Sequence, residues 1–234
     1  MKNCFLLAFA CFMFSSLASQ AQLCEVHPFF KQGSTLGYTH YNAAGKPENK
    51  SVQTVKSVQK TGETKTAEIH AEILSKKDKV ENTIDFGVSC TGNVFSMDFK
   101  SLIPSQSLKA YKNMEMAIEG INQEYPEKMS VGQSLPDGKV KIKMSSSGMA
   151  MMDMEMNIVN RKVEAMETLE TPAGKFECTV ISQESSMVTT TMGMPMKMNF
   201  KSKEWFSPKA GMVKSEDYSE KGKLRGYTLL TELK

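Results

Sequence analysis

Strict alternation of apolar and polar residues is the feature of this sequence that most restricts its fold. The segment Thr66–Ile73 reads Thr-Ala-Glu-Ile-His-Ala-Glu-Ile, so its alanines and isoleucines share one face of an extended chain. Similar segments are separated by turn-forming clusters, for example at 136–138, 172–174 and 221–223. Roughly a dozen short strands with regular turns are typical of a sandwich or barrel. The sequence therefore predicts an all-β chain, an antiparallel meander that forms an open or closed barrel-like sheet.

One hairpin can be predicted together with its register. We expect Lys139–Ser146 to pair with Ala150–Ile158 across the three-residue loop that separates them. Apolar side chains then meet on one face, and lysines meet acidic residues on the other. A slip of one residue would separate both sets of partners, so this register is strongly specified. The predicted pairs are Met144–Met152, Ile142–Met154, Val140–Met156, Lys143–Asp153 and Lys141–Glu155.

The segment near 100–138 departs from this alternation. It contains prolines at positions 104, 126 and 136, which interrupt regular pairing. We expect a short helix/loop insertion here, with a helix at Ser105–Tyr111 and a strand near Met114–Glu119. The segment either connects two halves of the sheet or marks a domain boundary. We prefer the connection, with residues 22–234 forming a single β-rich domain.

Residues 1–21 have the composition of a cleaved signal peptide. A lysine at position 2 precedes an apolar run at 4–17, which is too short to span a bilayer as a helix. Small residues at positions 19 and 21 then occupy the −3 and −1 positions of a cleavage site. Lipid attachment would need a small residue before the cysteine, whereas Leu23 precedes Cys24. We therefore predict an exported protein, periplasmic or secreted rather than a lipoprotein, with no transmembrane segment in the mature chain.

Three cysteines follow the signal segment, and in an oxidising compartment three pairings are compatible with the sequence. Cys178 shares a strand face with Phe176 and Val180, which is typical of a buried and unreactive thiol. We predict a disulfide between Cys24 and Cys90.

Methionine is unusually frequent, with 19 residues, and is concentrated at 149–156 and 192–198. Methionines two residues apart share one face of a strand. Three roles fit this pattern: filling an irregular core, lining a face for an apolar ligand, or binding Cu(I) through thioethers, which are soft ligands. Core filling is the simplest of the three. The hypothetical ligand-facing residues are Met152, Met154, Met156, Met194, Met196, Met198 and Phe200.

Residue types that build catalytic and metal sites are scarce. The chain has three histidines, and His70 lies between Glu68 and Glu72 on one strand face, a pattern that is most simply a solvent-exposed side. No Gly-x-Ser-x-Gly, His-Glu-x-x-His or phosphate-binding glycine motif is present. Basic and acidic residues are interspersed, which argues against nucleic-acid binding. We predict no catalytic residue, no cofactor and no metal ligand.

Short motifs in the C-terminal third carry a family resemblance. They are Thr-Pro-Ala-Gly-Lys-Phe-Glu-Cys at 171–178, Glu-Trp-Phe at 204–206 and Gly-Met-Val-Lys-Ser-Glu at 211–216. Together with the segment 131–137 and the spacing of Gly33, Tyr38 and Tyr41, they resemble the TapB-like group of exported bacterial proteins, a family of unknown function. The resemblance covers nearly the whole mature chain and implies an exported, β-rich protein. Its motifs are structural, so it implies no functional residues.

These observations favour a non-catalytic binding module for an apolar small molecule, a lipid or an envelope partner. The one-sided methionine segments are the main reason. Two alternatives stay open: a methionine-rich periplasmic protein that binds Cu(I), and a hydrolase with an unrecognised site.

Overall fold

A computed structural model describes residues 23–98, 115–146, 149–191 and 193–234. Its 13 strands form one sheet in which the paired strands are antiparallel, in the order β6-β8-β9-β10-β11-β12-β13-β1-β2-β3-β4-β5-β7. This confirms the predicted all-β, barrel-like meander. The elements are α1 (Leu23–Val26), the 3-10 turn η1 (Pro28–Phe30), β1 (Thr35–Asn42), β2 (Pro47–Thr61), β3 (Thr64–Ser75), β4 (Val80–Thr91), β5 (Val94–Met97), β6 (Glu115–Ile121), β7 (Gln123–Pro126), β8 (Gly138–Ser146), β9 (Met149–Thr171), β10 (Gly174–Thr191), β11 (Met194–Ser207), β12 (Gly211–Ser219) and β13 (Leu224–Leu233).

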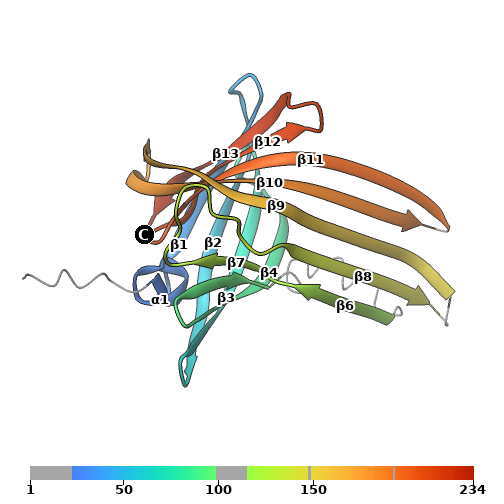
Figure 1. Cartoon of the computed structure of the whole chain (residues 1–234), viewed down its shortest axis with the longest axis horizontal. Helices are drawn as coiled ribbons and strands as arrows, with labels where there is room; N and C mark the ends of the chain where they lie inside the picture. The colour runs from blue at the N-terminus through green and yellow to red at the C-terminus, as the bar shows by residue number, and fades with distance from the viewer. Residues whose placement is uncertain (1–22, 99–114, 147–148, 192) are drawn as a thin grey trace, which may run out of the picture.

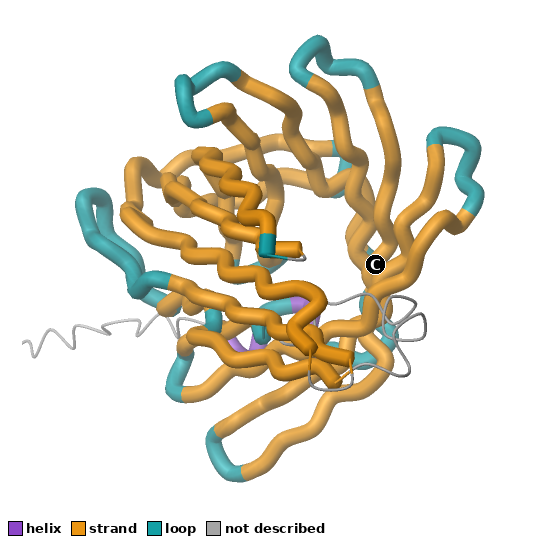
Figure 2. Tube along the Cα trace, turned by 90° about the vertical axis from the view of Figure 1, so that its right-hand side faces the viewer, coloured by secondary structure: helices purple, strands orange, loops and turns teal. Residues whose placement is uncertain are grey.

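The sheet has two parts, a barrel and an extension. Figure 2 looks along the barrel, whose strands form a ring, and Figure 1 shows β8, β9, β10 and β11 projecting together beyond it. The expectation that all strands are short is wrong, most clearly for β9 and β10, which have 23 and 18 residues, and also for β2 and β11, which have 15 and 14. Register shifts where they pair, at Val180/Ile181 and Ser182/Glu184, let the strands bend and continue.

One segment of chain closes the barrel by changing its pairing partner. In β6, Ile121 lies opposite Lys139 of β8, and two residues later Gln123 of β7 lies opposite Met97 of β5. The segment 115–126 therefore joins the two ends of the meander. The strand expected near Met114–Glu119 corresponds to β6, and the helix expected at Ser105–Tyr111 lies outside the described residues.

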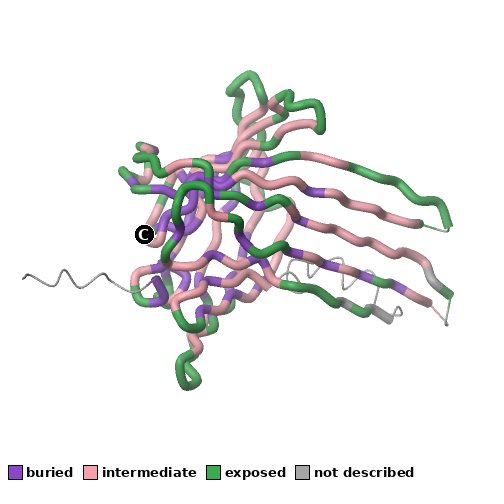
Figure 3. Tube along the Cα trace, in the orientation of Figure 1, coloured by how far each residue is buried: buried purple, intermediate pink, exposed green. Residues whose placement is uncertain are grey.

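The helical turns α1 and η1 pack into the core at the end of the barrel away from the extension. Leu23 and Phe29 are buried in the main apolar cluster, and the His27 ring stacks on Phe95 with centroids 4.4 Å apart. Burial lowers the pKa of His27 to about 3, so its ring is neutral and its Nδ1 accepts a hydrogen bond from the Phe29 amide. Figure 3 shows that buried residues are concentrated in the barrel. None of the helices among the described residues is long and apolar enough to cross a membrane.

The predicted β8–β9 hairpin has the expected register. All five predicted pairs are present, and Lys139 and Lys141 form ion pairs with Glu155 at 2.9 and 3.7 Å. A register shift between Met144 and Ser145 extends the pairing toward the tip of the hairpin, to Ser146 and Met149. Residues 147–148 of the expected loop lie outside the described residues. The register is specified because each face of the hairpin carries its own matched set of side chains.

Candidate functional site

The hypothetical ligand-facing residues lie on one face of the extension. Met156 of β9 is opposite Met187 of β10, which in turn is opposite Met198 of β11. Alternate positions along each strand share this side. We call this surface the methionine face. It consists of Val140, Ile142 and Met144 of β8, Met152, Met154, Met156 and Ile158 of β9, Met187 of β10, and Met194, Met196, Met198 and Phe200 of β11.

The methionine face is packed along β8 and β9 and exposed along β11. The β8 residues and Ile158 are buried, and the β9 methionines pack against them. On β11, by contrast, Met194, Met196 and Met198 are 70%, 66% and 46% exposed. The face is thus neither a closed core nor a fully open surface.

An unpaired strand edge explains the exposure on β11. Strand β12 pairs with β11 only from Phe200 to Ser207, so within the described residues no strand flanks 194–199 on that side. Pro195 lacks an amide donor and Lys197 adds a charge, and both features discourage pairing of an exposed edge with another chain. The β11 methionines are therefore accessible, while Pro195 and Lys197 disfavour pairing of this edge with a strand of another chain.

The methionine face continues into the interior of the barrel. Along β10, Met187 is followed inward on the same side by Ser185 and Gln183, and along β11, Phe200 is followed by Ser202 and Glu204. The lining therefore changes from apolar at the tip of the extension to polar within the barrel.

A buried polar cluster lies at the point where the barrel closes. The Arg161 guanidinium donates from Nη1 to the Glu124 carbonyl at 3.0 Å and to the Pro136 carbonyl at 2.8 Å. Its Nε donates to Gln183 at 3.3 Å, and its Cζ lies 5.0 Å from the centre of the Tyr125 ring. Arg161 thus connects β9 and β10 to β7 and to the loop that leads into β8. Arg161 therefore joins the strands that meet where the barrel closes.

Two inward side chains of β7 complete this cluster. Tyr125 donates its hydroxyl proton to Glu204 Oε2 at 2.8 Å, and Gln123 donates to Gln183 at 3.0 Å. We call Gln123, Tyr125, Arg161, Gln183 and Glu204 the seam cluster. Its central members are nearly inaccessible, with Arg161 1% and Tyr125 3% exposed, so the cluster is a buried polar link between the strands that meet at the closure.

Burial sets the protonation of the seam cluster. It raises the pKa of Glu204, against the lowering effects of the Tyr125 hydrogen bond and the Arg161 charge. The pKa of Tyr125 is raised well above its usual value by burial and by Glu204, so the hydroxyl keeps its proton. Sequence reasoning missed this cluster. The available signal was that Arg161 is one of two arginines among 29 basic residues, and arginine is the cation that best tolerates burial.

Replacing Glu204 with glutamine is expected to flatten the pH dependence of stability. Burial raises the pKa of Glu204 in the folded protein. The Glu204 carboxyl group therefore contributes most to the free energy of unfolding below its unfolded pKa, and this contribution is lost as pH rises through its folded pKa. The slope from one proton is at most about 1.4 kcal/mol per pH unit. Urea titrations from acid to alkaline pH should show the wild type losing stability relative to E204Q. With the control E184Q the opposite trend is expected: the wild type should gain stability relative to E184Q as pH rises, since the ion pair with Lys201 lowers the pKa of Glu184. Parallel curves for E204Q and wild type would contradict the ionisation of Glu204.

The histidine of the Glu68–Glu72 segment lies on the outer side of β3. His70 Nδ1 is 2.6 Å from Asp85 Oδ1, and its Nε2 is 4.0 Å from Glu72. Glu68 instead accepts a hydrogen bond from Ser57 at 3.1 Å. The described residues contain no group of three or more His, Cys, Asp or Glu placed to hold a metal ion. The segment forms hydrogen bonds on the surface of the sheet.

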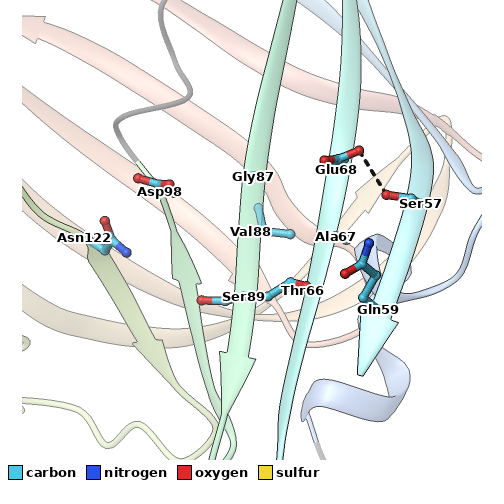
Figure 4. Close-up of a pocket in the computed structure, with 10 residues that line it drawn as sticks. All are labelled: Ser57, Gln59, Thr66, Ala67, Glu68, Gly87, Val88, Ser89, Asp98 and Asn122. Atoms are coloured by element: carbon cyan, nitrogen blue, oxygen red, sulfur yellow. Dashed lines mark hydrogen bonds between the residues drawn. The ribbon is translucent and has the colours of Figure 1, made fainter. Parts of the chain in front are cut away.

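A polar pocket of about 260 Å³ lies beside Glu68 and is drawn in Figure 4. Hydroxyl, amide and carboxylate groups line it, and the Ser57–Glu68 hydrogen bond crosses one side. This lining suits hydrogen bonding to a polar molecule, unlike the methionine face. The polar side chains are those of Ser57, Gln59, Thr66, Glu68, Ser89, Asp98 and Asn122.

The structure contains a disulfide between Cys24 and Cys90, with Cα atoms 5.6 Å apart. It ties α1 to the inner side of β4. Cys178 is a free and buried thiol. Burial, together with the charge of Glu167, raises its pKa to about 11, so the thiolate is disfavoured and the side chain is poorly nucleophilic.

Comparison with known proteins identifies both the fold and the family. A crystal structure of a protein from Bacteroides fragilis, described as exported and as having a YmcC-like fold, matches with a TM-score of 0.65 and 22% identity over 87% of this chain and 96% of that one. One of a protein from Parabacteroides distasonis, described as a lipoprotein, matches with a TM-score of 0.66 and 21% identity over 88% and 98%. No curated protein matches the chain. A family model matches residues 31–230, so the chain belongs to the DUF3108-like family.

Proposed function

We propose that this chain is an exported, non-catalytic binding module whose methionine face holds an apolar ligand such as the acyl chain of a lipid. The observation that carries the proposal is the exposure of Met194, Met196 and Met198 side by side on one strand face. Contiguous exposed apolar side chains mark interaction sites on proteins that are otherwise polar outside.

The dimensions and chemistry of the face suit an extended hydrocarbon chain. From Ile158 to Met152 the face runs along seven residues of β9, which are six steps of ~3.3 Å or about 20 Å. Methionine is unbranched and adapts its shape to a partner, and such residues recur at surfaces that accept varied apolar ligands. The polar lining toward Ser202 and Glu204 would then be adjacent to the head of an amphipathic ligand.

The proposed location is outside the cytoplasm. The composition of residues 1–21 supports export, and so do the descriptions of the two proteins of similar fold as exported and as a lipoprotein. The sulfur of Cys24 is bonded to Cys90 and is not free to carry a lipid, which favours a periplasmic or secreted form. Assignment to the TapB-like group and a single domain at 22–234 belong to the same proposal.

Replacing Met194, Met196 and Met198 together with serine should weaken binding of a fluorescent long-chain fatty acid about 10- to 100-fold. Burying one such side chain against a ligand contributes about 1.5–3 kcal/mol when complete, and these three are open on one side. Fluorescence titration of the delipidated protein measures the effect. The matched control is V80S/V131S/M166S, which changes three apolar residues of similar exposure outside the methionine face.

Equal affinity in both triple variants would contradict the proposal. Native mass spectrometry of protein purified without refolding gives an independent check. A mass excess that disappears on denaturation is expected in the wild type, and it should be absent from M194S/M196S/M198S but present in the control.

A further inference from the structure

The last part of β9 has one unpaired edge. Residues 164–171 lie opposite β10 along their other edge. On the unpaired side, main-chain bonding ends at Val163, which donates to the Gln133 carbonyl and accepts from the Gly132 amide. In the described part of the chain, no main-chain group bonds to this side of 164–171, which we call the open edge. Such an edge presents a row of free amides and carbonyls to a further strand.

A turn at 130–133 accounts for the open edge. The Gln133 amide donates to the Ser130 carbonyl at 2.9 Å, and the Ser130 amide donates to Gln133 Oε1 at 2.9 Å. Gly132 has a φ of +88°, a conformation that favours glycine. The pairing of this segment with β9 therefore stops at the turn, and the residues that precede the turn form no main-chain hydrogen bond with the open edge.

A groove of about 960 Å³ lies beside the open edge. Met166 and Thr168 of β9 line one side, and Val26 of α1 and residues 127–129 line another. Met166 is 52% exposed, and with Val26 and Met129 it makes part of the lining apolar. The open edge spans seven steps of ~3.3 Å, or about 23 Å, which is enough for a short extended peptide.

We propose that the open edge binds an extended peptide of a partner protein, in which apolar residues alternate with basic ones. The free main-chain groups of β9 would pair with those of the peptide, and alternate side chains would decide which peptide fits. The apolar side chains of the peptide face the groove, beside Met166. The basic side chains lie on the other side of the added strand.

The charges of the open edge favour a basic peptide. Glu164 and Glu167 are exposed and accept hydrogen bonds from Ser182 at 2.7 Å and from Trp205 at 2.9 Å. Opposite charges on neighbouring strands stabilise their pairing, and like charges oppose it. The charges that line the groove are mixed, with three lysines and two glutamates, so the glutamates next to the added strand decide the preference.

The same glutamates disfavour a second copy of this chain as the partner. Two open edges paired with each other would bring glutamates of one copy close to those of the other. The segment 164–171 contains no proline, unlike the β11 edge with Pro195, so its amides are available to a strand of suitable charge.

A charge exchange tests the proposal. In fluorescence anisotropy, the wild type should bind a labelled Lys-Val-Lys-Val-Lys-Val-Lys peptide about 10-fold more tightly than Glu-Val-Glu-Val-Glu-Val-Glu. E164K/E167K should reverse this preference, and E164K, which keeps the bond from Trp205 to Glu167, should shift it in the same direction. The matched control E48K/E81K makes the same change of charge at two exposed positions elsewhere and should keep the wild-type preference. A wild type without preference, or equal effects of E164K/E167K and E48K/E81K, would overturn the inference.

Hydrogen exchange locates the bound peptide. The Lys-Val peptide should slow exchange of amides within 164–171 and leave those of 194–199 on β11 unchanged. Protection at 194–199 in place of 164–171 would also overturn the inference. M194S/M196S/M198S should bind this peptide like the wild type, so the peptide site and the apolar-ligand proposal stand or fall separately.

Discussion

Replacing Arg161 with methionine is expected to lower the free energy of unfolding by about 3–5 kcal/mol. Arg161 is 1% exposed and donates two hydrogen bonds to the carbonyls of Glu124 and Pro136, at the place where the barrel closes. Methionine would fill most of the volume but leave both carbonyls without their donor, and each buried unpaired group costs about 1–3 kcal/mol. It would also leave Glu204 without the nearby positive charge.

Urea and thermal unfolding measure this effect. For a chain of this size the melting temperature should fall by about 2–4 °C for each kcal/mol lost. The matched control is R225M, which changes the other arginine of the chain at an exposed position and should have little effect. If R161M is as stable as R225M, the main-chain pairing of β6 and β7 closes the barrel without help from the seam cluster.

Coupling within the seam cluster gives a second test of the same argument. The double variant R161M/E204Q should be more stable than the sum of the two single changes predicts, since the carboxylate that Arg161 compensates has been neutralised. Additive effects would mean that Arg161 acts through its bonds to the two carbonyls alone. Hydrogen exchange at the β7 amides should speed up in R161M. Strand β7 pairs with β5 along one edge, and the hydrogen bond from Arg161 to the Glu124 carbonyl links it to β9.

The sequence predicted those parts of the fold in which both strand faces carry a matched pattern. The β8–β9 hairpin is the clearest case, with apolar partners such as Ile142 and Met154 on one side and lysine–acid pairs on the other. For the closing segment 115–126 the sequence predicted a strand near Met114–Glu119 and a connection between two halves of the sheet, but no pairing partner. Its change of partner from β8 to β5 depends on pairing between residues far apart in the chain, which a local pattern does not encode.

The seam cluster was missed for a related reason. Arg161 lies between Asn160 and Lys162, so the local sequence is polar on both strand faces and indicates no buried side chain. In the structure Asn160 has a φ of +56°, and a register shift between Ser182 and Glu184 of the paired strand lies beside it. An irregularity of this kind changes which residues face inward, and the outcome is a buried arginine.

The composition of the methionine face was predicted in part. The clusters at 149–156 and 192–198 indicated which strands carry methionine, but Met187 stands between Ser186 and Val188, outside both clusters. Only its register with β9 and β11 places it beside Met156 and Met198. The exposure of the β11 methionines depends on where β12 ends, which is again a property of the assembled sheet.

Removing the disulfide with C24S/C90S is expected to lower the free energy of unfolding by about 4 kcal/mol. The two cysteines are 66 residues apart, and a cross-link over a loop of this length restricts the unfolded chain by about that amount in the chain-entropy model. The disulfide also holds α1, with Leu23, in the core at the end of the barrel. Chemical unfolding in the absence of reductant measures the difference, and reduced wild type should resemble the double variant.

The control is C178S, which alters a buried thiol that forms no disulfide and should cost less than C24S/C90S. A peptide map without reduction should recover Cys24 joined to Cys90 and Cys178 unmodified, and a bridge to Cys178 would contradict the assignment. The disulfide and the methionine face lie at opposite ends of the molecule, since α1 packs at the barrel end and the face lies on the extension (Figure 1). C24S/C90S should therefore bind the fatty-acid probe like wild type under conditions in which both are folded. Weakened binding in that variant would mean that the extension depends on the barrel for its shape.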